Sequence, residues 1–248
     1  MMIRTLVPLA IAFLLAAPST SHAQISAYSQ NFESLAPAEP IPGSNSALAD
    51  DGWRFFVNVY NPDWSYAYQY GAFPAPNSLL GISAVGIGGS VPGNQNMGVY
   101  SDYNNSSAHL GGQFVQTSLF QLQTIGSSDV GTTWNFQFDV RRLNLVAPST
   151  ALAFIQTLNP NNGQASSTVT VDMSAVPDSW GTYVLPFTIT AGAGQLLQFG
   201  FLNTATNYNP STIVYDNISL APVPEPSTYA LMLAGLGLLC GAVRRRRH

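Results

Sequence analysis

The chain has 248 residues, of which 46% are hydrophobic and 8% are charged, and it contains no lysine. This length suits one large domain or two small ones, and the hydrophobic fraction is sufficient for a full core. An average globular protein carries about 25% charged residues. The low charge argues against a nucleic-acid binder, which needs a basic patch, and against a charge-rich helical bundle.

The charges are unevenly distributed along the chain. Five of the eight arginines lie near the two ends, at position 4 and at positions 244–247. Between Gln24 and Val223 three arginines stand against eleven acids, a formal charge of −8. The net charge of −4 therefore combines an acidic body with a basic tail. A single cysteine, Cys240, excludes a disulfide framework within the chain and a cysteine zinc site.

Residues 1–23 have the features of a secretory signal peptide. Arg4 supplies a positive n-region, and the apolar run Leu6–Ala17 is too short to span a bilayer comfortably. The small residues of Ser21-His22-Ala23 predict cleavage by signal peptidase before Gln24. The alternative is an uncleaved membrane anchor, which the short apolar run and the good cleavage site disfavour.

Residues 223–248 have three parts in a strict order. The first is the motif Val223-Pro224-Glu225-Pro226-Ser227. The second is the uncharged run Thr228–Val243, which is a marginal length for a transmembrane helix. The third is the block Arg244, Arg245, Arg246 and Arg247. The positive-inside rule keeps this block in the cytoplasm and places the body outside. Gly237 and Gly241 have the spacing of a helix-dimer seam, although flexibility is favoured in so short a span.

This tripartite layout resembles the PEP-CTERM sorting signal of Gram-negative bacteria. The resemblance covers only residues 223–248, but it occurs together with an N-terminal signal. It implies export, transient anchoring in the inner membrane, and processing by an exosortase near Pro224-Glu225-Pro226. Proteins with this signal usually accompany exopolysaccharide production, as in biofilms, and end at the cell surface or outside the cell.

The body, residues 24–222, predicts an all-β domain, an antiparallel β-sandwich or jelly roll, with no convincing helix. Apolar and polar residues alternate in several segments that are separated by Gly, Pro and Asn clusters, as expected for half-buried strands. The predicted strands are 112–124, 133–140, 150–158, 169–173, 182–190, 197–201 and 212–220. The stretch 71–98 is rich in Gly, Pro, Ser and Asn and predicts a long loop over one sheet.

Two ends of the body resemble jelly-roll carbohydrate-binding modules of the galactose-binding-like type. The segment Gln30–Leu35 contains a Phe-Glu pair, and Ile213–Leu220 contains an Asp-Asn pair. Asp178–Tyr183 and Phe199–Phe201 are also similar. The resemblance spans most of the body through short, degenerate motifs, and it implies a jelly-roll fold.

In such modules the first-strand Glu and the last-strand Asp often hold a structural calcium ion. The resemblance therefore implies Glu33 and Asp216 as ligands, with backbone carbonyl oxygens completing the shell. Terminal strands of a sandwich are commonly neighbours, and two carboxylates there repel each other unless a cation or a proton intervenes. The alternative is that both are solvated edge residues. No other cofactor is expected.

The sequence offers little for hydrolytic chemistry, and no catalytic residue is predicted. His109 is the one histidine left once both ends are removed, and no G-x-S-x-G elbow is present, since Gly81–Gly86 has the wrong spacing. A serine triad and a histidine metal site are therefore disfavoured. A glycosidase that uses two carboxylates stays open, because eleven acids remain in the body.

One segment carries a row of aromatic residues: Trp64, Tyr66, Tyr68 and Tyr70. On a regular strand these four side chains project from one face. Aromatic rings stack on the apolar C–H faces of sugars, so the row is a candidate glycan platform. The alternative is one wall or the rim of the sandwich core.

Three functions follow from these expectations. The first is a non-catalytic surface or matrix protein that binds, or lies within, extracellular polysaccharide. The alternative is a secreted glycan-active enzyme with an acidic site, and the third is a purely structural matrix component. The expected partners are signal peptidase and exosortase, the inner membrane transiently, and extracellular polysaccharide, with no nucleic acid.

Overall fold

The computed structural model describes residues 25–36, 47–70, 80–83, 93–102 and 104–224. The predicted signal peptide and nearly all of the predicted sorting segment lie outside the described residues. No helix in the described part of the chain is long and apolar enough to cross a membrane.

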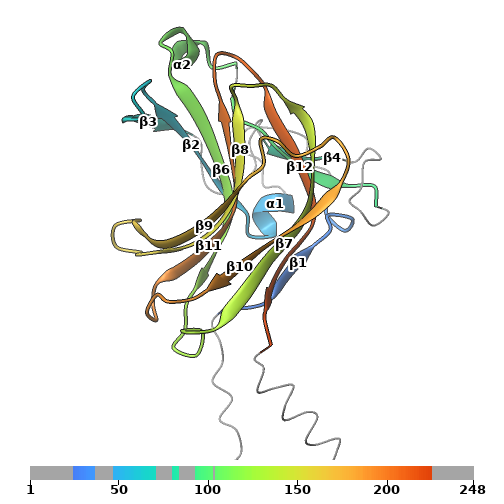
Figure 1. The fold of residues 1–248 in the computed structure, drawn as a ribbon, viewed down its shortest axis with the longest axis vertical. Coiled ribbons are helices and arrows are strands. Elements are labelled where there is room, and N and C mark those ends of the chain that lie inside the picture. Colours follow the sequence, from blue (N-terminus) through green and yellow to red (C-terminus); the bar gives the residue numbers. More distant parts are fainter. Residues whose placement is uncertain (1–24, 37–46, 71–79, 84–92, 103, 225–248) are drawn as a thin grey trace, which may run out of the picture.

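Two six-stranded antiparallel sheets pack face to face and confirm the predicted β-sandwich (Figure 1). Sheet A has the order β10-β7-β12-β5-β4, and β1 also pairs with β12. Its strands are β1 (Tyr28–Gln30), β4 (Leu80–Ser83), β5 (Asn96–Val99), β7 (Thr133–Leu145), β10 (Gly181–Thr188) and β12 (Ser211–Pro222). Sheet B has the order β3-β2-β6-β11-β8-β9. Its strands are β2 (Arg54–Tyr60), β3 (Tyr66–Tyr70), β6 (Phe114–Thr124), β8 (Thr150–Leu158), β9 (Ala165–Asp172) and β11 (Leu196–Ala205).

Short elements correct the sequence-based prediction in two places. The body contains two helices of a single turn, α1 (Ala47–Asp50) and α2 (Ser106–Leu110), where none was expected. Strand β4 and all of β5 except Val99 lie inside the stretch 71–98 that was predicted as a loop. Elements of four or five residues are too short to show a periodic pattern, so composition alone decided those predictions.

The core between the sheets is built from aromatic side chains at alternate strand positions. Phe136 and Phe138 of β7 face Phe199 and Phe201 of β11, and all four are buried. Phe201 also stacks on Tyr215 of β12, with the ring centroids 3.6 Å apart. The alternation of apolar and polar residues therefore predicted β7 and β11 correctly, and it also predicted which face of each strand meets the opposite sheet.

Candidate functional site

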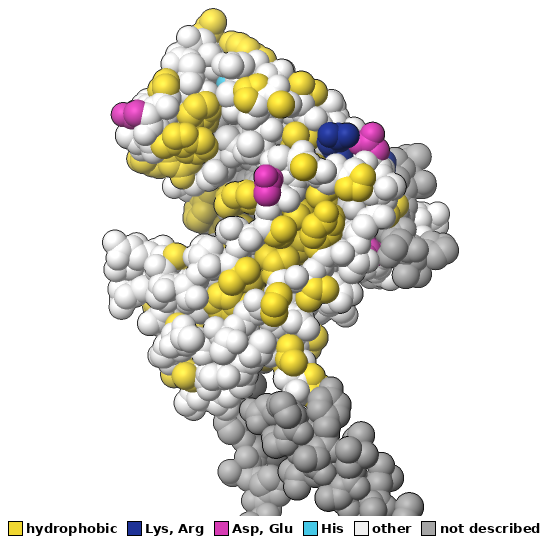
Figure 2. All heavy atoms as spheres, in the orientation of Figure 1, with side chains coloured by type: hydrophobic (Ala, Val, Ile, Leu, Met, Phe, Trp, Pro, Cys, Tyr) yellow, Lys and Arg dark blue, Asp and Glu magenta, His cyan; other side chains and the backbone are white. Residues whose placement is uncertain are grey.

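The outer face of sheet B, which points away from sheet A, is hollowed. Figure 2 shows this hollow between the part of the molecule that contains β2 and β3 and the part that contains β9, with hydrophobic side chains at its back. Phe120 of β6 and Phe154 of β8 are buried, yet they do not belong to the core cluster. The strand registers place them on either side of Gly200, on the outer face. These rings form the floor of a groove.

Gly200 of β11 permits the close approach of strands at this floor. A Cβ atom at this position would lie 2.1 Å from the carbonyl oxygen of Leu119 and 2.7 Å from the Cα of Phe120. Real Cβ atoms do not come so close to a neighbouring backbone, so no other residue fits without a shift. The groove thus depends on the missing side chain of Gly200.

Amide and hydroxyl side chains form a bank on each side of the floor. The strand registers place Gln69, Asn58, Gln116 and Thr204 in one bank, and Gln198, Gln156 and Thr168 in the other. The Gln116 amide donates to the Thr204 hydroxyl at 3.2 Å. Thr168 donates to Gln156 at 3.1 Å, and Gln156 donates to Gln198 at 2.6 Å. These bonds orient the amides, and the amides keep further donors and acceptors for a ligand.

The outer face of sheet B is nearly free of charge. On its six strands the registers leave two charged side chains on this face, Arg54 at the start of β2 and Asp172 at the end of β9. The site is therefore suited to a neutral ligand that is rich in hydroxyl groups, because it offers hydrogen bonds without a strong field.

Four aromatic side chains form the rim of the groove at the β2–β3 hairpin: Tyr60, Trp64, Tyr66 and Phe114. Trp64 stacks on Phe114 with the ring centroids 4.7 Å apart, and Tyr60 lies 5.8 Å from Trp64 and 6.4 Å from Tyr66. Trp64 and Tyr66 are nevertheless 55% and 59% exposed. Partial burial raises the pKa of Tyr60 above its ordinary value.

Trp64 occupies an unusual backbone position in the turn between β2 and β3. Its φ of +64° lies in the left-handed region, which glycine usually fills in hairpins of this kind. The turn is held by Asn61, whose N–H donates to the Ser65 carbonyl at 2.9 Å and whose carbonyl accepts from the Trp64 N–H at 2.8 Å. Asp63 accepts from the Ser65 backbone and hydroxyl, which lowers the pKa of Asp63. A bulky residue kept in such a conformation is typical of a functional position.

The predicted aromatic row does not lie on one face, and this prediction is wrong. A β-bulge interrupts the β2–β3 register, so that Tyr66 pairs with Tyr60 whereas Tyr68 pairs with Val59. Directly paired residues share a face. Tyr66 therefore lies on the outer face with Tyr60, and Tyr68 lies on the inner face with the buried Val59. The extra residue at a bulge cannot be read from alternation.

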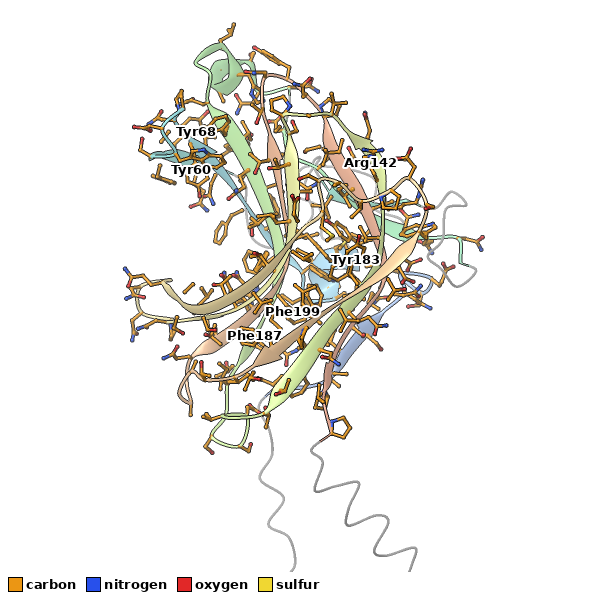
Figure 3. The ribbon with its side chains drawn as sticks, in the orientation of Figure 1. Tyr60, Tyr68, Arg142, Tyr183, Phe187 and Phe199 are labelled. Atoms are coloured by element: carbon orange, nitrogen blue, oxygen red, sulfur yellow. The ribbon has the colours of Figure 1, made fainter. Side chains whose placement is uncertain are left out.

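Tyr68 and Tyr70 belong to the inner side of the hairpin. Their rings lie 6.2 Å apart, and Tyr70 packs against the core cluster. The Tyr70 hydroxyl donates to Asp102 at 2.9 Å and accepts from Asn105 at 3.2 Å, and burial raises its pKa. Tyr68 is 38% exposed because it lies near the sheet edge. Figure 3 shows Tyr60 and Tyr68 on this hairpin, away from Phe199 in the core.

Glu33 and Asp216 have different environments. Glu33 is exposed, and its Oε1 accepts the backbone N–H groups of Asn94 and Gln95 at 2.6 and 2.8 Å. Asp216 is buried and accepts the Asn217 N–H at 2.7 Å, so it is not a solvated edge residue. The described residues contain no group of three or more His, Cys, Asp or Glu side chains that would hold a metal. Calcium at Glu33 and Asp216 stays a prediction.

The structure also pairs two acids that the sequence did not single out together. Asp216 of β12 lies directly opposite Asp139 of β7, and both are buried. Asp139 accepts hydrogen bonds from Thr182 and from Asn217. Alternation marked Asp139 only as a polar strand position, and the pairing of Asp139 with Asp216 depends on a register that the sequence does not show.

His109, the histidine considered for catalysis, is buried, and its Nε2 lies 3.1 Å from the Asp102 carbonyl oxygen.

One comparison with known proteins identifies the tail. Residues 222–247 match the model of the PEP-CTERM protein-sorting motif. No curated protein is significantly similar in sequence.

Solved structures that resemble the body include both binding modules and parts of enzymes. The arabinose-bound MgGH51 α-L-arabinofuranosidase has a TM-score of 0.44 and 13% identity over 78% of this chain and 25% of its own. The CBM22-1–GH10 modules of Clostridium thermocellum xylanase 10B have a TM-score of 0.41 and 12% sequence identity. The match covers 82% of this chain and 29% of the xylanase chain. A β-1,4-galactotriose complex of TmCBM61 has a TM-score of 0.35 and 8% sequence identity. The match covers 69% of this chain and 88% of the TmCBM61 chain.

The chain thus spans about a quarter of the two enzyme chains, and similarities at this level carry no argument about its activity. The sequence match of the tail is the firmer finding. The chain carries a PEP-CTERM protein-sorting motif at residues 222–247, which indicates an exported, exosortase-sorted protein.

Proposed function

We propose that the exported body is a non-catalytic module that binds neutral extracellular polysaccharide in the groove of sheet B. The observation that carries this proposal is the exposed aromatic rim beside an amide-lined groove on a sheet face whose strands carry few charges. Trp64 and Tyr66 present open ring faces for the apolar C–H side of a sugar. The two amide banks supply donors and acceptors for the sugar hydroxyls.

The position of the acids favours binding over hydrolysis. Glycosidases need two carboxyl groups about 5–9.5 Å apart on either side of the bond that they cleave. On the outer face of sheet B the strands carry one acid, Asp172, and the acid of the β2–β3 turn, Asp63, accepts hydrogen bonds from Ser65 that hold the turn. The pair Asp139 and Asp216 is buried on the other sheet and hydrogen-bonded, which keeps it from a polymeric substrate.

Affinity electrophoresis tests this proposal on the secreted protein. The probes are soluble xylan, galactan, hydroxyethylcellulose and the exopolysaccharide of the producing cell. We expect retardation in at least one gel, and a loss of at least about tenfold in affinity, about 1.4 kcal/mol, for Trp64→Gly or Tyr66→Ser. Tyr68→Ala, on the opposite face of the same hairpin, is the matched control and keeps binding. Release of reducing ends from a retained polymer would instead support the enzyme.

We propose in addition that the tail anchors the protein transiently in the inner membrane before exosortase processes it near Pro224-Glu225-Pro226. The secreted product is then expected to begin at Gln24 and to lack the arginine block. Intact-mass measurement checks both ends, and a product that retains Arg247 contradicts the processing. Replacement of the three motif residues by alanine is expected to leave the protein in the membrane.

A further inference from the structure

A second concave site lies on the opposite side of the sandwich. A pocket of about 420 Å³ opens between β1 and β12, on sheet A. Its volume falls within the range of small-molecule sites, about 300–1,000 Å³. It is lined by Ser29, Gln30, Asn31, Ser34, Asn217, Ile218 and Ser219. The pairing of Ser29 with Ser219 places this pocket on the outer face of sheet A, because the neighbouring Ile218 is buried in the core.

The pocket exists because β12 contains a bulge. The β7–β12 register shifts between Asp216 and Ser219, and Asn217 has a φ of +47°. Asparagine tolerates this left-handed conformation better than most residues. The side-chain amide of Asn217 donates to Asp139 at 2.7 Å, which fixes its orientation. The bulge thus interrupts the regular strand pairing beside this polar recess.

The lining is uncharged and has unused hydrogen-bonding groups. The hydroxyls of Ser29, Ser34 and Ser219 form no hydrogen bond with any residue that the structure describes. No lining side chain carries a positive charge, so a phosphate is not favoured. No aromatic ring lines it, which disfavours a flat apolar ligand. Hydroxyl and amide groups in a recess of this size fit a small polyhydroxy compound.

We propose that this pocket binds a single sugar residue, and that the protein uses the pocket and the groove together to link two polysaccharide chains. The pocket lies on the outer face of sheet A and the groove on the outer face of sheet B. The two sheets lie face to face (Figure 1), so the core separates the two sites. One short stretch of polymer cannot reach both faces. The linking role rests on the proposed function of the groove, whereas binding of a sugar in the pocket does not.

Amide NMR titration of the secreted, ¹⁵N-labelled protein tests the pocket alone. The probes are glucose, galactose and mannose at up to about 100 mM, well above a millimolar Kd. We expect saturable shifts at the amides of Ser29, Asn31 and Ser219 with at least one sugar. Ser219→Val removes a hydroxyl, fills the recess and suits a strand, so it abolishes these shifts. Thr188→Val, on the same face of β10, is the control and keeps them. Absence of shifts with all three sugars overturns the pocket.

Sedimentation of protein–polysaccharide mixtures tests the linking. The polymer is the one that the protein retains in affinity electrophoresis. We expect the unaltered protein to sediment the polymer, Ser219→Val to bind it without sedimenting it, and Trp64→Gly to lose both. If Ser219→Val sediments as much polymer as the unaltered protein does, the proposed linking of two polysaccharide chains is wrong. If the unaltered protein retains no polymer, the groove proposal and the linking fail together, and the NMR result still decides the pocket.

Discussion

The two faces of sheet B carry similar aromatic residues that differ in their surroundings. Phe199 and Phe201 on the inner face are fully buried against β7 and β12. Trp64 and Tyr66 on the outer face are more than half exposed, although they also contact other rings. On the inner face another sheet excludes water, whereas no strand of sheet A covers the outer face. Exposure here follows from topology rather than from residue type.

This comparison separates stability from binding. Burial of a large apolar side chain contributes about 1.5–3 kcal/mol relative to exposure. The inner face therefore holds the fold together, and the outer face is free to present rings to a ligand. Substitutions on the two faces are expected to change different measurements.

The largest effect is expected on the inner face, for Phe201→Ala. Phe201 stacks on Tyr215 and contacts Trp53 and Phe138, so its removal leaves a cavity between the sheets. Loss of a large buried aromatic costs about 3–5 kcal/mol of unfolding free energy. Urea denaturation followed by tryptophan fluorescence measures this. Retention of polysaccharide per folded molecule is expected to stay unchanged, and a selective loss of binding would break the separation of the two faces.

Calcium is the next largest expected effect, and it tests whether groups outside the core add to stability. An ion held by Glu33 and Asp216 only in the folded state would add about 2.7 kcal/mol at a hundredfold excess over Kd. The melting temperature of protein purified with calcium is then expected to fall when a chelator is added. Glu33→Gln is expected to remove this response. An identical melting curve with and without chelator would contradict the calcium site.

The sequence predicted the inner face of the sandwich well, because long strands repeat the period-2 signal many times. Strands β6, β7, β8, β11 and β12 each have nine or more residues and overlap the predicted strands, and β7 and β11 extend beyond the predicted ranges. The groove was not predictable in the same way. Phe120 and Gly200 come together only through the register of β6 and β11, which are about 80 residues apart along the chain.

The aromatic rim was found in part, for a physical reason. Trp64 and Tyr66 were selected by their residue type, and the structure leaves both exposed. Tyr60 and Phe114 lie on neighbouring strands, so their contribution needs the sheet topology. The position of Tyr68 was predicted on the wrong face, because one extra residue at the bulge reverses the alternation.

A smaller loss of stability is expected for Gly200→Ala, which adds a methyl group at the groove floor, where strands β6 and β11 pack closely. The added methyl group would clash with the Leu119 carbonyl and the Phe120 backbone. Overpacking of this kind costs about 1–3 kcal/mol, and it also displaces the groove floor. Both the melting temperature and the affinity for polysaccharide are therefore expected to fall together. Unchanged binding at a lowered melting temperature would show that the ligand does not touch the floor.

The smallest effect on stability, with the clearest effect on binding, is expected for Trp64→Gly. Glycine adopts the φ of +64° without strain, which stabilises the turn, while the stack on Phe114 is lost.

These two changes oppose each other, so the unfolding free energy is expected to move by less than about 1 kcal/mol in either direction. Thermal melting measures the change in stability, and affinity electrophoresis of the same preparation measures the change in affinity for polysaccharide. Tyr68→Ala removes an aromatic ring from the other face of the same hairpin and is expected to keep polysaccharide binding. Equal retention of polymer by both variants would remove Trp64 from the binding site and leave its strained conformation without a functional reason.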